Sequence, residues 1–215
     1  MDPGFWLDRW REGRIGFHEG RPNTFLERHA GRLAGARRVL VPLCGKAEDL
    51  AYLAGRGHEI VGVELVEDAV KAFFAEHGAT PAVRGHGPFV EYRAGAITIL
   101  AGDMFATTRA LLGPIDAYYD RAAVIALPPP LRARYVPHLR GLLDAGAPGL
   151  VITLEYEQAR MDGPPFAVHE DELRALYAGA QVELIEEAPA TGNPRLLEIG
   201  GATERCFVIT GAATT

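Results

Sequence analysis

One segment near the start of the chain constrains its fold more than any other. Residues 39–41 are an apolar run, which leads through Pro42-Leu43-Cys44-Gly45-Lys46 into a predicted helix. A second predicted strand covers residues 59–64, with an apolar run at residues 60–63, and ends on Glu64, 19 residues after Gly45. A buried strand, a glycine-bearing turn, a helix and another strand form the repeating unit of a doubly wound sheet. In such a sheet Glu64 lies beside the turn, where a carboxylate can accept hydrogen bonds from both hydroxyls of a ribose.

Size and composition fit a single globular domain. The chain has 215 residues, of which 48% are hydrophobic and 23% charged, so it can bury a sizeable core without disulfide or metal cross-links. Its net charge of −6 provides no basic surface for nucleic acid or an anionic membrane. The two cysteines, Cys44 and Cys206, make no disulfide framework, so we expect a reducing, cytoplasmic setting. The sequence has no signal-peptide pattern and no apolar run approaching the ~20 residues of a membrane span.

Strands and helices alternate along most of the chain. We expect helices over residues 5–14, 22–33, 46–56, 67–77, 130–143 and 169–177, and strands over residues 39–41, 59–64, 89–93, 96–101, 116–120, 150–155, 182–188 and 205–210. The strands on either side of Ala94-Gly95 read as a hairpin, and one of the last two strands is antiparallel because no full crossover helix separates them. The alternation predicts the α/β class, with a mainly parallel sheet covered by helices on both faces.

The turn after the first strand narrows the choice of ligand. It contains one glycine, Gly45, and therefore lacks the Gly-x-Gly-x-x-Gly pattern that lets a backbone approach a pyrophosphate. Ala47 follows Lys46, so the phosphate-binding ending Gly-Lys-Ser/Thr is missing too. A nucleoside cofactor without phosphates fits better, and S-adenosylmethionine, with its ribose, adenine and methionyl zwitterion, is the obvious one. On the turn alone, an ordinary βα loop and a surface acid at Glu64 explain the pattern equally well.

Residues at four consecutive strand ends support a ligand site. They are Leu43, Glu64, Asp103-Met104 and Asp120-Arg121. Ligands of open α/β sheets bind outside the carboxyl ends of the strands, so we expect these residues to face one crevice. Arg121 offers a planar fork suited to a carboxylate, and Asp120 suits an ammonium group or a structural partner. Taken alone, the Asp120-Arg121 pair is more typical of a local ion pair.

Aromatic residues near the N-terminus suggest a cover for that crevice. Trp6 and Trp10 have helical spacing, and Phe17 and His18 follow them. Either tryptophan alone is typical of helix packing, but together with Phe17 they can exclude water and attract a sulfonium through cation–π contacts. His18 is a candidate base, although a hydrogen-bonded structural histidine is commoner. The seven scattered histidines have no ligand spacing, so we expect no metal, and there is no Gly-x-Ser-x-Gly nucleophile turn.

Longer motifs make the chain similar to one known family. They are Phe5-Trp6 through Trp10, Ile15-Gly16-Phe17-His18, Val41-Pro42-Leu43-Cys44-Gly45-Lys46, Gly57-His58, Val61-Gly62-Val63-Glu64, Ala72-Phe73-Phe74, Asp120-Arg121 and Gly163-Pro164-Pro165-Phe166. With these motifs in the same order over nearly the whole chain, the sequence resembles the bacterial branch of the thiopurine S-methyltransferase family. Pro-Leu-Cys-Gly-Lys together with the N-terminal Trp and Phe-His segment is a specific signal.

This resemblance implies a class I methyltransferase, a Rossmann-like fold with a mainly parallel seven-stranded sheet, an antiparallel last strand and helices on both faces. It implies one domain over residues 1–215, with an N-terminal helical lid, residues 1–34, on an α/β core, residues 35–211. The cofactor S-adenosyl-L-methionine, and its product S-adenosyl-L-homocysteine, would bind through Trp10, Leu43, Glu64, Asp103, Met104 and Arg121. Phe17 matches a position that lines the acceptor site, and Arg195 matches a basic residue near the acceptor more loosely.

The resemblance also implies S-methylation of aromatic or heterocyclic thiols such as thiopurines. Such a thiol is partly thiolate near neutral pH and the sulfonium is a good leaving group, so the protein mainly aligns the reactants and excludes water. We therefore expect no dedicated catalytic residue, with Asp120 a weak candidate only.

Alternative functions remain open on the same residues. The acceptor can instead be a selenium or tellurium compound, a halide or another small thiol. The expected acceptor wall, formed by Phe17, residues 163–166 and Arg195, is the feature that distinguishes between these acceptors. A module that binds the cofactor without turnover belongs to a different class, and the single-glycine turn disfavours an NAD-dependent oxidoreductase. We expect a monomer whose partner is a small molecule rather than nucleic acid or a membrane.

Overall fold

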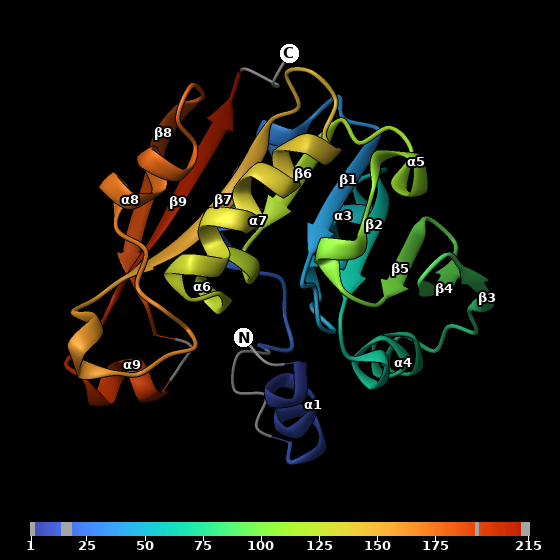
Figure 1. Ribbon diagram of the computed structural model, residues 1–215, viewed down its shortest axis with the longest axis horizontal. Coiled ribbons are helices and arrows are strands. Elements are labelled where there is room, and N and C mark those ends of the chain that lie inside the picture. Colours follow the sequence, from blue (N-terminus) through green and yellow to red (C-terminus); the bar gives the residue numbers. More distant parts are fainter. Residues whose placement is uncertain (1–2, 14–18, 192–193, 212–215) are drawn as a thin grey trace.

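The computed structural model describes residues 3–13, 19–191 and 194–211. Within these ranges a single sheet of nine strands crosses the molecule in the order β3-β4-β5-β2-β1-β6-β7-β9-β8 (Figure 1). The strands are β1 (Arg38–Pro42), β2 (Glu59–Glu64), β3 (Ala82–His86), β4 (Phe89–Ala94), β5 (Ile97–Ala101), β6 (Ala117–Asp120), β7 (Gly149–Glu155), β8 (Gln181–Pro189) and β9 (Thr203–Thr210).

The central strands confirm the predicted α/β class. Strands β5, β2, β1, β6 and β7 are parallel, and β1 and β2 pair in a register that sets Leu40 opposite Val61. Their apolar side chains are buried because helices cover both faces of the sheet. The expected hairpin is present as β4 and β5, and the last strand, β9, runs antiparallel to both β7 and β8.

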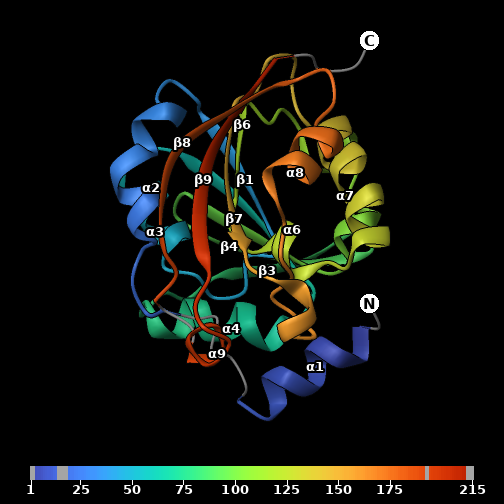
Figure 2. The same cartoon turned by 90° about the vertical axis from the view of Figure 1, so that its left-hand side faces the viewer.

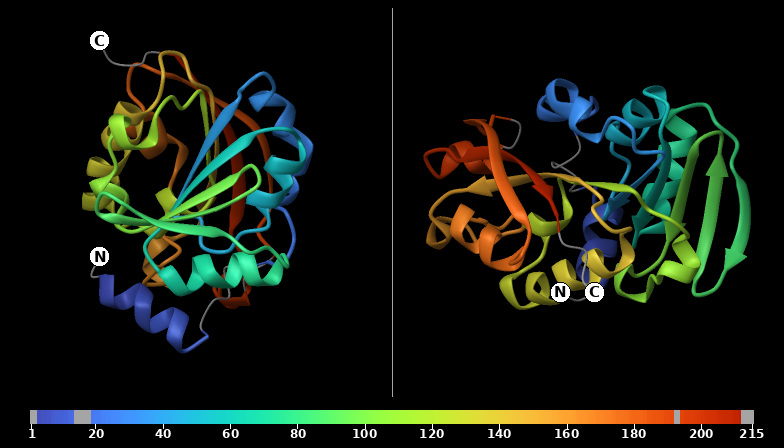
Figure 3. Two further views of the ribbon diagram at one scale, coloured as in Figure 1. Left: turned by 90° about the vertical axis from the view of Figure 1, so that its right-hand side faces the viewer. Right: turned by 90° about the horizontal axis from the view of Figure 1, so that it is seen from above.

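The sheet has nine strands in the described residues, where seven were expected. Seven strands in the order β5-β2-β1-β6-β7-β9-β8 form one continuous block, and β4 and β3 extend it antiparallel beyond β5. The extension lies at one end of the sheet and β8 at the other (Figure 3). Strand β3 gives no sequence signal, because Ala-Val-Arg-Gly-His remains largely exposed and has no apolar face to bury.

Helices pack on the two faces of the sheet around separate apolar cores. The helices are α1 (Pro3–Arg11), α2 (Thr24–His29), α3 (Asp49–Gly55), α4 (Glu67–Glu76), α5 (Arg109–Leu112), α6 (Ala123–Ala126), α7 (Pro129–Leu142), α8 (Glu170–Leu176) and α9 (Pro194–Glu198), with 3-10 turns η1 (Ala30–Leu33), η2 (Met104–Ala106) and η3 (Gln158–Arg160). Helices α2 and α3 cover one face through Phe25 and Leu50, and α7 and α8 cover the other through Leu139 and Leu173 (Figure 2). No helix in the described ranges is both long and apolar enough to cross a membrane.

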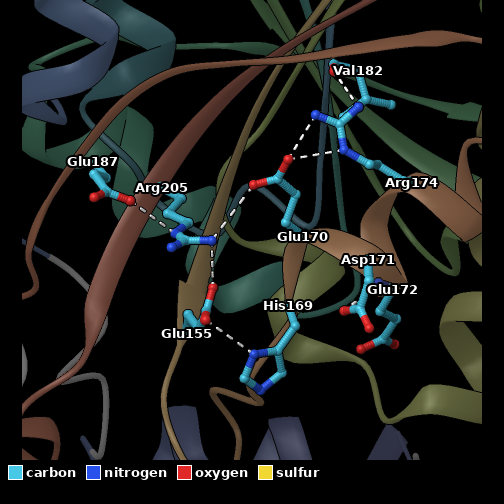
Figure 4. Close-up of polar contacts among 9 residues, drawn as sticks. All are labelled: Glu155, His169, Glu170, Asp171, Glu172, Arg174, Val182, Glu187 and Arg205. Carbon is cyan, nitrogen blue, oxygen red and sulfur yellow. Dashed lines mark hydrogen bonds and ion pairs between the residues drawn. The ribbon is translucent and has the colours of Figure 1, made fainter.

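A polar cluster ties α8 to the sheet. Arg205 of β9 lies 2.7 Å from a carboxylate oxygen of Glu155 on β7 and 3.1 Å from one of Glu187 on β8 (Figure 4). It also reaches Glu170, the first residue of α8, at 3.6 Å. The ring of His169 lies 3.3 Å from Glu155 on the same side. The cluster therefore fixes the start of α8 across three strands.

Candidate active site

A pocket of about 1080 Å³ opens at the carboxyl ends of the central strands. Most of the site residues expected from the sequence line it, namely Trp10, Leu43, Glu64, Asp103, Met104, Arg121 and Arg195. Helix α1 lies beyond these strand ends and brings Trp6 and Trp10 to the pocket (Figure 1). Phe17 and His18 fall outside the described residues. The crevice is at the place where open α/β sheets bind their ligands.

The turn between β1 and α3 forms part of the pocket lining. Leu43 and Gly45 both have left-handed backbones, with φ of 48° and 53°, a conformation that is strained for leucine and open to glycine. A Cβ at Gly45 would lie 3.5 Å from the ring of Trp10, which packs over the turn. Beneath it, a Cβ at Gly62 of β2 would lie 2.8 Å from the Sγ of Cys44. The missing side chain at position 62 lets Cys44 pack against the sheet, whereas the Trp10 ring leaves room for a Cβ at position 45, where glycine is favoured by the left-handed backbone.

The carboxylate of Glu64 connects this turn to the end of β2. Its side chain is only 7% exposed, and its two oxygens accept hydrogen bonds from the N–H groups of Gly45 at 2.7 Å and Val66 at 2.8 Å. Burial raises the pKa of Glu64, and the bonds from Val66 and Gly45 oppose that rise because they favour the ionised carboxylate. Each oxygen keeps a lone pair that can accept a further hydrogen bond from a ligand in the pocket.

The segment after β5 carries the next pair of expected residues. Asp103 accepts a hydrogen bond from the N–H of Phe105 at 2.9 Å, which caps the turn η2. Met104 is buried, and its carbonyl oxygen accepts from the hydroxyl of Thr107 at 2.7 Å and lies 3.0 Å from Nε2 of His138 on α7. These bonds hold residues 103–105 in place along the pocket.

Asp120 and Arg121 are neighbours in sequence with different surroundings. Asp120 is fully buried, and its carboxylate accepts from the N–H groups of Ala123 and Val124 and from the hydroxyl of Tyr135 at 2.7 Å. Burial raises its pKa to about 6, against the pull of these hydrogen bonds. Asp120 therefore binds the first two N–H groups of α6 and is not part of the pocket lining, so of its two expected roles the structure supports the structural partner.

Arg121 faces the pocket among carboxylates. Its guanidinium forms an ion pair with Glu19, in the segment that leads into α2. Asp49 and Glu204 are also close enough that, with Glu19, they raise the pKa of Arg121 even though burial acts to lower it. Asp49 is held in turn by the N–H of Asn23 at 2.7 Å and the hydroxyl of Tyr119 at 3.1 Å. The fork of Arg121 is thus fixed beside the pocket and suits a carboxylate ligand.

The other side of the pocket is an apolar wall with an arginine at its edge. Pro164 and Pro165 line it, and their carbonyl oxygens accept hydrogen bonds from Arg195 of α9 at 3.2 Å and from the hydroxyl of Tyr156 at 2.6 Å. Arg195 is therefore brought to the same wall as the Gly163-Pro164-Pro165-Phe166 motif, although its own side chain is mostly exposed.

Several pocket residues have no signal in the sequence. They are Glu19, Asn23, Glu204, Ile125, Leu127, Leu131, Arg134 and Tyr135. Glu19, Asn23 and Glu204 come from distant parts of the chain and meet only in the folded protein. The run Pro128-Pro129-Pro130 is the one local hint of the α6–α7 wall, because it ends one short helix and starts the next beside a strand end.

Comparisons with known proteins agree with this geometry. The family model described as thiopurine S-methyltransferase matches residues 1–208. The chain belongs to the thiopurine S-methyltransferase family. A thiopurine S-methyltransferase of Pseudomonas putida is 45% identical over 214 residues, covering 97% of this chain and 99% of the relative. One from Pseudomonas aeruginosa is 47% identical over 204 residues, covering 93% of this chain and 94% of the relative.

A solved structure supports the fold independently of close sequence similarity. The 1,6-didemethyltoxoflavin-N1-methyltransferase of Burkholderia thailandensis, crystallised with 1,6-didemethyltoxoflavin and S-adenosylhomocysteine, superposes with a TM-score of 0.65 at 17% identity. The match covers 98% of this chain and 87% of that one. The architecture of this family member is thus that of a class I methyltransferase, as the strand order and the pocket position already indicate.

Proposed function

We propose that this protein transfers a methyl group from S-adenosylmethionine to the sulfur of a small aromatic or heterocyclic thiol, such as a thiopurine. The observation that carries the proposal is Glu64, a buried carboxylate at the end of β2 that is bound to the turn after β1 and faces a pocket large enough for a cofactor and an acceptor. Membership of the thiopurine S-methyltransferase family supports the same reaction.

The cofactor fits the residues on the β1, β2, β5 and β6 side of the pocket. Glu64 accepts hydrogen bonds from the ribose hydroxyls, and Asp103 and Met104 flank the adenine. Trp10 packs over the turn at Leu43 and shields the sulfonium, and Arg121 binds the methionyl carboxylate. Each role matches the chemistry and position of the side chain.

The acceptor binds between the cofactor and the apolar wall, with Arg195 at its edge. The family resemblance adds Phe17 to the residues that contact the acceptor. The bound cofactor would supply an electrophilic methyl group from its sulfonium. When the methyl group is transferred, the rest of the cofactor leaves as a neutral thioether. The thiolate sulfur forms the new bond to the methyl carbon, and the electron pair of the broken bond stays on the leaving sulfur. The protein's part is to hold the two sulfurs in line and exclude water, so no residue needs to act as a general base.

The proposal extends to domain organisation and oligomeric state. We propose that residues 1–215 form a single domain in which the N-terminal segment, residues 1–34, covers the core, residues 35–211. Support comes from α1, which places Trp6, Arg9 and Trp10 along the pocket. Since one chain supplies every proposed contact, we propose that the protein acts as a monomer.

A methyl-transfer assay tests the proposed function. Purified protein would be incubated with methyl-labelled S-adenosylmethionine and a panel of thiopurines, thiophenols, alkyl thiols, hydrogen selenide and iodide. We expect label on the aromatic and heterocyclic sulfur compounds with the highest kcat/KM. Preferential labelling of selenide or iodide would move the acceptor to the alternative class, and labelling of none would contradict the proposed reaction.

A further inference from the structure

One buried arginine holds part of the acceptor wall from behind. Arg132 of α7 is 1% exposed, and its Nε donates hydrogen bonds to the carbonyl oxygens of Val124 at 3.0 Å and Leu127 at 2.8 Å. These two carbonyls bracket Ile125 and Ala126, both of which line the pocket. Burying a guanidinium is costly, and Nη2 of Arg132 is buried without a hydrogen-bond partner among the described residues, so its position depends on the contacts of Nε and Nη1.

The same guanidinium reaches the proline segment of the wall. Its Cζ lies 5.8 Å from the centre of the Phe166 ring, in cation–π range. The N–H of Phe166 donates to the carbonyl oxygen of Ile125 at 2.6 Å, which joins the two parts of the wall directly. Pro164 and Pro165 precede Phe166 and have no N–H of their own, so their position depends on neighbouring groups.

Glu172 of α8 links this arrangement to the frame of the protein. Its carboxylate accepts from Nη1 of Arg132 at 2.6 Å. Glu170 on the same helix points toward Arg205 and the sheet, while Glu172 is turned away from that cluster (Figure 4). Arg132 therefore connects the wall to a helix that is itself fixed on three strands.

We propose that Arg132 is a positioning residue that sets acceptor specificity. It fixes the wall of residues 125–127 and 164–166, so that a flat aryl thiol lies in line with the methyl group and a flexible alkyl thiol does not. The inference rests on the proposed function and adds a specificity determinant to it. The hydrogen bonds of Arg132 within the described ranges go to Val124, Leu127 and Glu172, all away from the Glu64 turn, so cofactor binding should be spared.

Matched variants on α7 and α8 test this role. Arg132→Lys keeps the charge but loses the fork, Glu172→Ala removes the link to α8, and Glu172→Gln keeps an oxygen that accepts from Nη1. Arg109→Lys is the control, because it makes the same exchange at a guanidinium that pairs with Asp144, after the far end of α7. For each variant, kcat and KM are measured with thiophenol and with 2-mercaptoethanol, alongside the Kd for S-adenosylhomocysteine and the Tm.

The expected pattern separates positioning from stability. Arg132→Lys should raise the KM for thiophenol about tenfold and reduce the aryl-to-alkyl ratio of kcat/KM by a similar factor, since small misplacements of bound groups are costly. The Kd for S-adenosylhomocysteine should stay within about twofold of the wild-type value. Glu172→Ala should shift the ratio in the same direction, Glu172→Gln should restore it, and Arg109→Lys should change only the Tm.

Two results would overturn the inference. One is an unchanged aryl-to-alkyl ratio in Arg132→Lys and Glu172→Ala, and the other is a loss of cofactor affinity that parallels the rise in KM. If Arg132→Lys fails to fold, the comparison of Glu172→Ala with Glu172→Gln decides. A wild-type protein that binds no S-adenosylhomocysteine, or that methylates neither thiol, would instead contradict the proposed function itself.

Discussion

Glu64 shows how one residue serves structure and ligand together. Its carboxylate is buried, and two backbone N–H groups, from Gly45 and Val66, compensate for the lost hydration of the charge. The bond from Gly45 also holds the left-handed turn against the end of β2. A ribose in the pocket then meets oxygens whose positions are already fixed, so little ordering is needed when it binds.

At the same scale, Arg121 should discriminate between ligands with and without a carboxylate. Arg121→Lys keeps a positive charge near Glu19, Asp49 and Glu204 but loses the planar fork. We expect the affinity for S-adenosylhomocysteine to fall about tenfold, while that for 5′-methylthioadenosine, which has no amino-acid carboxylate, stays unchanged. Isothermal titration with both ligands measures the difference. An equal loss for both would argue against contact between Arg121 and the carboxylate.

Asp120 should make stability depend on pH. Its pKa rises from 3.8 to about 6 on burial, so the folded chain holds the proton more tightly than the unfolded chain does. Its contribution is therefore fully present below the unfolded pKa and is lost as the pH rises through the folded value. Asp120→Asn removes this titration, so its stability relative to wild type should improve by about 3 kcal/mol between pH 3.5 and pH 7. Urea unfolding at the two pH values checks this, and a constant difference would refute it.

At the scale of elements, the contact between β2 and the turn after β1 has little spare room. A Cβ at Gly62 would meet the Sγ of Cys44 at 2.8 Å and a side-chain carbon of Ile99 at 3.2 Å. Gly62→Ala should cost about 1–3 kcal/mol of unfolding free energy and weaken binding of S-adenosylhomocysteine, because the turn must shift. Gly141→Ala is the control, since that helical position has open space and should gain up to about 1 kcal/mol. Equal stabilities for the two variants would contradict this packing argument.

The elements also show what can be predicted from sequence. The strand over residues 59–64 was predicted with its observed bounds, because its apolar run ends sharply on Glu64. The exposed β3 and the short helices α5, α6 and α9 have too little periodicity to be recognised. At the site, residues at strand ends converge because the topology requires it, whereas Glu19 and Glu204 meet Arg121 through tertiary packing that leaves no local pattern.

At the scale of the whole molecule, the N-terminal segment and the pocket should respond together to a ligand. Helix α1 contributes Trp6, Arg9 and Trp10 to the lining, while β3 lies at the far edge of the sheet. At 100 times its Kd, S-adenosylhomocysteine should slow amide exchange in residues 3–11 by roughly tenfold or more and leave residues 82–86 unchanged. Hydrogen exchange followed by mass spectrometry measures both segments at once. Unchanged exchange in residues 3–11 would contradict the proposed cover.

The central claim is that the pocket at the carboxyl ends of the strands holds S-adenosylmethionine through Glu64. The most direct measurement is isothermal titration of S-adenosylhomocysteine into the wild-type protein and into Glu64→Ala, with circular dichroism to verify that the variant is folded. We predict one site per chain in the wild type and an affinity at least about tenfold lower in the variant, since a charged hydrogen-bond acceptor is lost. Equal affinities, or no binding to the wild type, would contradict the account.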